Sequence, residues 1–196
     1  MTIFRLGLTG SIGMGKSTTA ALFAAEGIPV WDADAAVHRL YAPGGSAVGP
    51  VAALCPAALH HDGIDRSVLR EWIASNPAAL PLLESVVHPL VQADRQAFLA
   101  QISDGIVVFD IPLLFEKGTE ADVNATLLVT APAELQRQRV LSRPGMTEVQ
   151  FALILSRQMP DAEKRARATH IVETLSVEQT QSYVQALIAH LRSGHA

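Results

Sequence analysis

Short apolar runs recur along the chain at wide intervals, separated by longer stretches with helical spacing. The runs are rich in Val, Ile and Leu, each has the length of a buried strand, and they lie at 3–9, 28–32, 106–112, 125–132 and 170–174. The alanine-rich stretch after the first run ends at Gly27, which is typical of a helix stop. Because strands and helices alternate, the pattern predicts an α/β fold with a doubly wound, parallel five-stranded sheet covered on both faces.

A first segment without this alternation covers residues 43–105. It opens with the Pro/Gly-rich linker APGGSAVGP and continues with helical spacing at 66–75 and 78–101, with no clear strand among them. The simplest interpretation is a helical flap over the carboxyl edge of the sheet.

A second such segment covers roughly 133–167 and has the pattern of two helices broken at Pro144 and Gly145, with Thr147 as a cap for the second. It concentrates positive charge in an acidic chain, which favours an anion ligand, although a solvated helix face is an equal alternative for Arg165 and Arg167. Seven of the fifteen Lys and Arg residues lie here: Arg137, Arg139, Arg143, Arg157, Lys164, Arg165 and Arg167.

The pattern as a whole predicts a single domain over residues 1–196. Its expected parts are a core (1–42, 105–132 and 168–196), a helical insertion (43–104) and a lid (133–167).

Composition narrows the class of protein. With 196 residues and 49% hydrophobic content, the chain can bury a sizeable core. A net charge of -4 argues against general binding to nucleic acid or membrane surfaces. The single cysteine, Cys55, fits a reducing compartment, and no apolar run approaches the ~20 residues that span a bilayer. We therefore expect a soluble, cytoplasmic protein.

The clearest motif joins the first strand to the first helix. Gly10, Gly15, Lys16 and Ser17 match G-x-x-x-x-G-K-S. Glycines let the backbone form a nest of inward N–H groups, and the helix adds its positive end. Lys16 can reach the outer phosphates and the Ser17 hydroxyl can ligate Mg²⁺. This motif predicts binding of a nucleoside triphosphate.

The phosphate loop alone does not separate a kinase from a GTPase switch or a motor ATPase. Asn-Lys-x-Asp and Asp-x-x-Gly, which a GTPase would carry, do not occur in the sequence. The small size, the arginine-rich lid and the helical flap favour a small-molecule kinase.

Carboxylates follow two of the predicted strands. Asp32 and Asp34 end the second, where strand alternation would place both on one side, facing the phosphate loop; they could orient an acceptor hydroxyl, take its proton or help hold Mg²⁺. The alternative is a turn or helix cap. Asp110 ends another strand and has the same alternative. His88, in the apolar flap, is more often structural than chemical.

Six motifs, in order, resemble the dephospho-coenzyme A kinase family over nearly the whole chain. They are LTGSIGMGKST, DAD followed by Arg39, DGIDRSVLR, HPLV, DIPLLFE, and a lid pattern from QRQRVLSRPGMT through RQMPDAEKRARA. The resemblance implies a P-loop fold of the nucleotide-kinase type. It also implies that ATP with Mg²⁺ phosphorylates the ribose 3′-hydroxyl of dephospho-coenzyme A.

The resemblance also implies roles by position. Asp34 matches the general base, with Asp32 beside it, while Arg139 and Arg143 match lid arginines. The triphosphate and its metal ion would be held by Gly13, Met14, Gly15, Lys16, Ser17 and Thr18. The acceptor pocket would be lined by Asp34, Arg39, His88, Leu113, Leu114 and Glu116, which changes the expectation for His88.

The chain departs from the family pattern at Ser11 and Met14 in the loop, and at Thr169 and Thr174, where Asp and Asn are common. The last two flank the strand that leads to the expected adenine loop, so the base contacts are where this chain is expected to differ.

Two alternatives remain open: another small phosphate-loop kinase, acting on a nucleotide, sugar or shikimate, and a nucleotide-dependent switch or binding module. HPLV and DIPLLFE disfavour the first, and an acceptor base has no use in the second. The pattern makes no prediction of oligomeric state.

Overall fold

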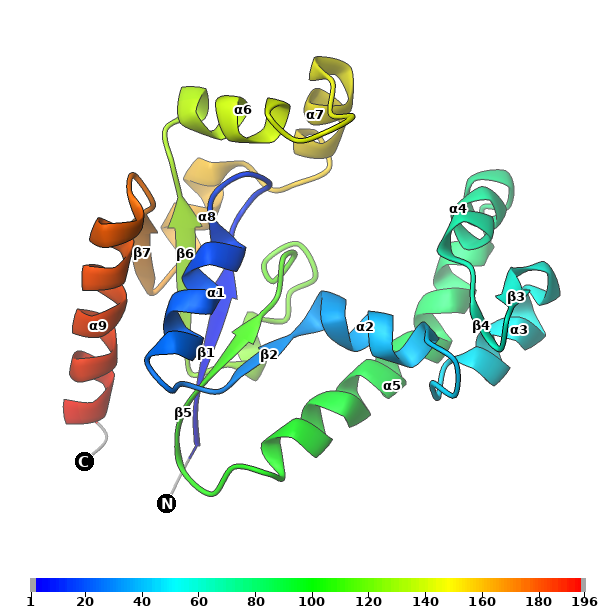
Figure 1. Cartoon of the computed structure of the whole chain (residues 1–196), viewed down its shortest axis with the longest axis horizontal. Coiled ribbons are helices and arrows are strands. Elements are labelled where there is room, and N and C mark those ends of the chain that lie inside the picture. Colours follow the sequence, from blue (N-terminus) through cyan, green and yellow to red (C-terminus); the bar gives the residue numbers. More distant parts are fainter. Residues whose placement is uncertain (1–2, 195–196) are drawn as a thin grey trace. The chain divides into compact units, whose positions relative to one another are not determined.

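The computed structural model describes residues 3–194, which form two compact units (Figure 1). One comprises the chain up to Trp31 and from Ser103 onward, and the other comprises Asp32–Ile102. The second unit begins earlier than the expected insertion because helix α2 (Ala33–Tyr41) packs on α5 (Ala79–Leu99). No helix within 3–194 has the length and apolar content needed to cross a bilayer.

The first unit contains the predicted five-stranded sheet, in the order β2-β5-β1-β6-β7. The pairings of β1 with β5, β1 with β6 and β6 with β7 are parallel, which confirms the predicted topology. The strands are β1 (Ile3–Thr9), β2 (Val30–Asp32), β5 (Gly105–Asp110), β6 (Ala125–Thr130) and β7 (His170–Glu173).

The central strands are buried apolar runs, as expected for a parallel sheet with covered faces. Leu8 and Leu127 of neighbouring strands pack with Phe23 of α1 (Lys16–Ala25) and with Val184 and Ile188 of α9 (Val177–Ser193). Helices α1 and α9 contact each other and β5, so they cover part of the sheet together. This core holds the carboxyl ends of β1 and β6 in place.

The predicted lid contains three helices where two were expected: α6 (Ala133–Leu141), α7 (Glu148–Leu155) and α8 (Asp161–Arg167). Thr147 caps α7 as predicted, in a capping box with Gln150. The missed break lies at Pro160, immediately before α8. A proline disfavours helical backbone at the residue before it, so the pattern could not continue as one helix.

The second unit is helical apart from one short hairpin. The expectation of no strand here is wrong, because β3 (Leu59–His60) pairs antiparallel with β4 (Gly63–Ile64). The predicted helices are confirmed as α4 (Arg66–Ser75) and α5, and α3 (Val48–Leu54) occupies the end of the expected linker. A separate apolar core, which includes Leu40, Val51, Leu69, Leu83 and Val87, holds this unit together.

Candidate active site

The phosphate loop runs from the end of β1 to the start of α1. Gly13 and Gly15 have φ values of 77° and 87°, in the left-handed region that favours glycine. A Cβ on Gly10 would lie 2.4 Å from a methyl carbon of Val129, so that position also requires glycine. Among the described side chains none caps the first turn of α1, whose N–H groups therefore suit an anion.

Two glutamines of the predicted lid hold the backbone of this loop. The Gln136 side-chain amide donates to the Ile12 carbonyl at 2.7 Å, and the Ile12 N–H donates to Gln158 Oε1 at 3.1 Å. The Met14 side chain is buried in the core, and the Ala131 N–H donates to its sulfur. Met14 can therefore serve a ligand only through its backbone.

Lys16 pairs with Asp110 at the end of β5. Its Nζ lies 2.5 Å from Asp110 Oδ1, and both side chains are largely buried. The third carboxylate singled out from sequence thus lies beside the lysine of the phosphate loop. Because the pair is charge-assisted, it holds the lysine side chain in a defined position.

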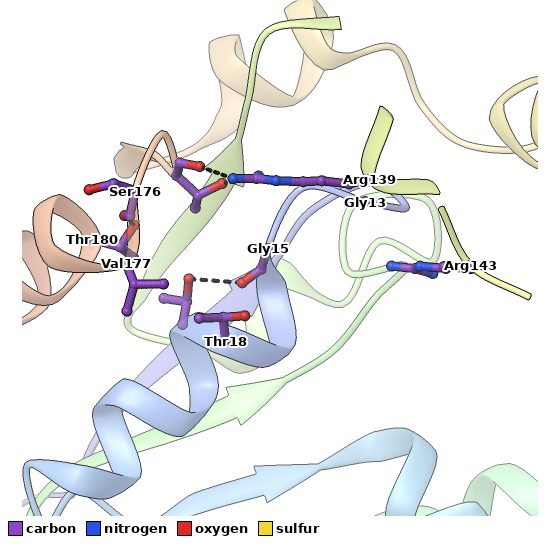
Figure 2. Close-up of a pocket in the computed structure, with 10 residues that line it drawn as sticks. Gly13, Gly15, Thr18, Arg139, Arg143, Ser176, Val177 and Thr180 are labelled. Carbon is purple, nitrogen blue, oxygen red and sulfur yellow. Dashed lines mark hydrogen bonds between the residues drawn. The ribbon is translucent and has the colours of Figure 1, made fainter. Parts of the chain in front are cut away.

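A cavity of about 340 Å³ opens over the phosphate loop. Arg139 and Arg143 approach it from the α6 side, and residues around the start of α9 line the opposite side (Figure 2). A glycine nest faced by two guanidinium groups suits a polyanion such as a triphosphate. The lining residues are Gly13, Gly15, Thr18, Thr19, Arg139, Arg143, Thr174, Ser176, Val177 and Thr180.

Other members of the basic cluster are bound by carboxylates of the protein, which separates them from the two arginines at the cavity. Arg165 donates to Asp161 and Glu173, and Arg167 donates to Glu120. Both arginines are therefore paired with carboxylates and do not only face solvent. Contacts with Asp161 come first among the influences that raise the pKa of Arg165. Only part of the predicted anion cluster therefore lines the cavity.

Asp32 ends β2 and caps α2. Its Oδ1 accepts hydrogen bonds from the backbone N–H groups of Asp34, at 2.8 Å, and Ala35, at 3.0 Å. The expectation that both aspartates lie on a strand is wrong, because α2 begins at Ala33. The cap alternative holds for Asp32, whereas Asp34 lies in the first helical turn with an exposed side chain. Its orientation toward the phosphate loop stays a prediction.

Arg39 and His88 belong to the second unit. The Arg39 guanidinium on α2 donates to Asp94 Oδ1 on α5 at 2.7 Å, although the arginine side chain is 55% exposed. His88 is 59% exposed on α5, with its Nε2 3.9 Å from Glu84 Oε1. Asp94 was not found from sequence, because no spacing relates it to Arg39.

The segment after β5 carries the remaining predicted acceptor residues. Leu113 is half-buried, but Leu114 is fully buried beneath Gly7 and belongs to the core rather than to a ligand surface. Glu116 accepts from the Met159 N–H at 2.9 Å, and its Oε1 lies 2.8 Å from Nζ of fully buried Lys164.

The ionisation of Glu116 reflects these contacts. Partial burial raises its pKa, but the ion pair with Lys164 and the hydrogen bonds from backbone N–H groups outweigh this and hold the pKa below the usual value. Glu116 is therefore a charged partner of a buried cation, and a direct contact with a ligand stays a prediction.

Comparison with known proteins identifies the family. Residues 4–179 match the family model described as dephospho-CoA kinase. The chain belongs to the dephospho-CoA kinase family. It is 71% identical to the dephospho-CoA kinase of Cereibacter sphaeroides over 98% of both chains.

Solved structures share the fold of this chain. A crystal structure from Thermus thermophilus has 36% identity and a TM-score of 0.88, covering 97% of this chain and 99% of that one. A dephospho-CoA kinase from Campylobacter jejuni, at 22% identity and a TM-score of 0.74 over both full chains, shows the same fold.

In this member of the dephospho-CoA kinase family, the motifs that suggested the resemblance lie in both units. The phosphate loop, the segment after β5 and the predicted lid belong to the first unit, and HPLV and DGIDRSVLR belong to the second. Thr19, Ser176, Val177 and Thr180 line the cavity but were not found from sequence, and neither was the place of Thr174. Sequence marked it only as a departure from the family pattern, yet it lines the cavity and contacts Arg139.

Proposed function

We propose that this chain transfers the γ-phosphoryl group of ATP to the ribose 3′-hydroxyl of dephospho-coenzyme A, which gives coenzyme A and ADP. The observation that carries the proposal is the cavity that joins the phosphate loop to Arg139 and Arg143, in a chain of the dephospho-CoA kinase family. In phosphoryl transfer the protein mainly positions the reactants and stabilises charge on the transferred group.

On the donor side, the triphosphate would bind the N–H groups of the loop from Gly13 to Thr18. Lys16, already directed by Asp110, would contact the outer phosphate oxygens. Arg139 and Arg143 would neutralise charge that develops during transfer, and the lid at 133–167 would keep water from the phosphoryl donor. The adenine base of ATP would occupy the side of the cavity near Ser176 and Val177.

Mg²⁺ fits this donor set. Within residues 3–194, no group of three or more His, Cys, Asp or Glu side chains could hold a metal ion by itself. That suits Mg²⁺, which is usually held by few protein groups together with phosphate oxygens and waters. Ser17, at the start of α1, would ligate it, with Asp110 or Asp32 in its outer shell. When bound, the ion would neutralise phosphate charge.

On the acceptor side, Asp34 would orient the 3′-hydroxyl and take its proton, and Arg39, His88 and Leu113 would contact dephospho-coenzyme A. Support comes from the match of these positions to the family pattern and from the exposure of Asp34, Arg39 and His88, which leaves them accessible to a ligand. We also propose a cytoplasmic location, for which the free thiol of buried Cys55 is consistent support.

The test is ADP release with ATP and Mg²⁺ over a panel of acceptors: dephospho-coenzyme A, nucleoside monophosphates, shikimate and simple sugars. Stimulation by dephospho-coenzyme A alone is the expected result. Stimulation by another acceptor would favour another small-molecule kinase, and stimulation by none would favour a binding module. Lys16→Ala should lose most of its affinity for ATP with Mg²⁺, which a fluorescent ATP analogue would measure.

A further inference from the structure

Thr174 lies where three parts of the donor site meet. It follows β7 and precedes α9, and its side chain is buried between the phosphate loop and α6. Its backbone N–H donates to the Thr130 carbonyl at the end of β6, at 2.9 Å. The backbone of Thr174 is therefore anchored to the sheet independently of the contacts that its side chain makes.

The Thr174 hydroxyl links Arg139 to the loop. Arg139 donates from Nη1 to Thr174 Oγ1 at 2.9 Å and from Nη2 to the Thr174 carbonyl at 2.5 Å (Figure 2). Oγ1 in turn donates to the Met14 carbonyl at 2.9 Å, which lies nearer than its other acceptor, the Thr130 carbonyl at 3.3 Å. A hydroxyl has one proton to donate and lone pairs to accept, so both bonds can form together. They make a continuous chain from the guanidinium to the loop backbone.

The same side chain packs directly on the loop. A Cβ built on Gly15 would lie 2.9–3.2 Å from three side-chain atoms of Thr174. Thr174 therefore fills the space that the absent Gly15 side chain leaves, next to Lys16. A change in the conformation of the loop must move Thr174, and with it the group that holds Arg139.

We propose that Thr174 is a positioning residue, which holds the Arg139 guanidinium over the phosphate loop in an orientation that the loop backbone sets. The inference rests on the proposed role of Arg139 at the phosphates. Thr174 occupies two of the five guanidinium N–H donors, and the others are available to phosphate oxygens. The arginine is thereby oriented before ATP binds, which reduces the entropy lost on reaching the transition state.

The first test replaces only the hydroxyl. Valine keeps the branched shape that packs on Gly15, so Thr174→Val should lower kcat about ten-fold, with a smaller change in the KM for ATP. Thr174→Ser, which restores the hydroxyl, should recover kcat to within about three-fold. The matched control is Thr126→Val at the start of β6. It removes a buried hydroxyl that accepts from the Thr169 N–H, and it should keep wild-type kcat.

A double-mutant cycle separates positioning from a merely structural role. If Thr174 acts through Arg139, then Thr174→Val should change kcat less than about two-fold in an Arg139→Ala background. An equal loss in both backgrounds would overturn the proposal, and so would wild-type kcat in Thr174→Val or in Arg139→Ala. Thermal unfolding of each variant identifies a loss of kcat that comes from unfolding.

The cycle also distinguishes failure of this proposal from failure of the proposed function. If dephospho-coenzyme A did not stimulate turnover by the wild-type chain, the proposed function would be refuted. The coupling between Thr174 and Arg139 would then be measured as affinity for a nonhydrolysable ATP analogue with Mg²⁺. Additive losses of affinity in that cycle would overturn the positioning role.

Discussion

The phosphate loop and the acceptor residues differ in how firmly the surrounding chain holds them. The loop is fixed on several sides: Gln136 and Gln158 bond its backbone, Met14 is anchored in the core, and Asp110 holds Lys16. By contrast, Asp34, Arg39 and His88 extend exposed side chains from helices.

This difference indicates that the donor site is more preorganised than the acceptor residues are. The donor site is built by packing and exists before its ligand, so its contribution to catalysis should depend on single buried contacts. The exposed acceptor residues keep their hydration until a ligand replaces it, so their contribution should appear as chemistry and affinity with little effect on folding. Mutations on the donor side and on the acceptor side can therefore each test this difference.

The largest effect should come from Asp34→Asn. An amide cannot accept the hydroxyl proton, so kcat should fall about a thousand-fold. Affinity for an ATP analogue and the unfolding temperature should stay near wild type, because the side chain is exposed. Glu71→Gln, another exposed acid of the second unit, is the control and should retain full turnover. Near-normal turnover in Asp34→Asn would exclude Asp34 as the base.

Arg139→Ala tests the donor side. Loss of a group that meets charge mainly in the transition state should lower kcat about a hundred-fold, with a much smaller loss of ATP affinity. Arg137→Ala on the same helix is the control, since Arg137 pairs with Glu148 at the surface. Equal losses of kcat and ATP affinity would instead assign Arg139 to uniform binding of ATP.

The phosphate loop could be predicted from sequence because its glycines, lysine and serine lie close together along the chain and each has a local physical reason. The five strands could also be predicted from local sequence, because buried parallel strands are apolar runs. The hairpin at 59–64 could not, because strands of two residues leave no apolar run. Its turn residues His61 and Asp62 also adopt positive φ, which few sequence signals predict.

Long-range side-chain contacts explain what else was missed. Lys164 resembles its basic neighbours in sequence, yet it is fully buried and pairs with Glu116. Thr174 contacts Met14 and Arg139 from distant parts of the chain. Helical and strand periodicity report which face is apolar, and they do not identify the partner of a single polar residue.

A substitution of Glu116 tests whether this residue of the DIPLLFE motif stabilises the fold or contacts the acceptor. Glu116→Gln leaves Lys164 as an uncompensated buried cation, which should cost about 3–5 kcal/mol in the free energy of unfolding. Glu120→Gln is the control and should cost less, because its partner Arg167 is 41% exposed. A raised KM for dephospho-coenzyme A at unchanged stability would instead make Glu116 a ligand contact.

The same pair predicts a dependence on pH. Because the folded-state pKa of Glu116 is lowered, its contribution to stability is present above the unfolded-state pKa of about 4.3. The contribution is lost as the pH falls through the lower, folded-state value. Urea unfolding between pH 7 and pH 3 should show this component in the wild type and lack it in Glu116→Gln; identical pH profiles would contradict the assignment.

Arg39→Ala should have a small effect on stability. The pair with Asp94 is exposed on the arginine side, so the free energy of unfolding should change by less than about 1 kcal/mol. The KM for dephospho-coenzyme A should nevertheless rise several-fold, with the KM for ATP unchanged. Arg70→Ala, on exposed α4 surface of the same unit, controls for lost positive charge. If Arg39→Ala destabilised the fold strongly and left both KM values alone, Arg39 would be a structural residue, and the second unit would hold its polar groups as firmly as the phosphate loop is held.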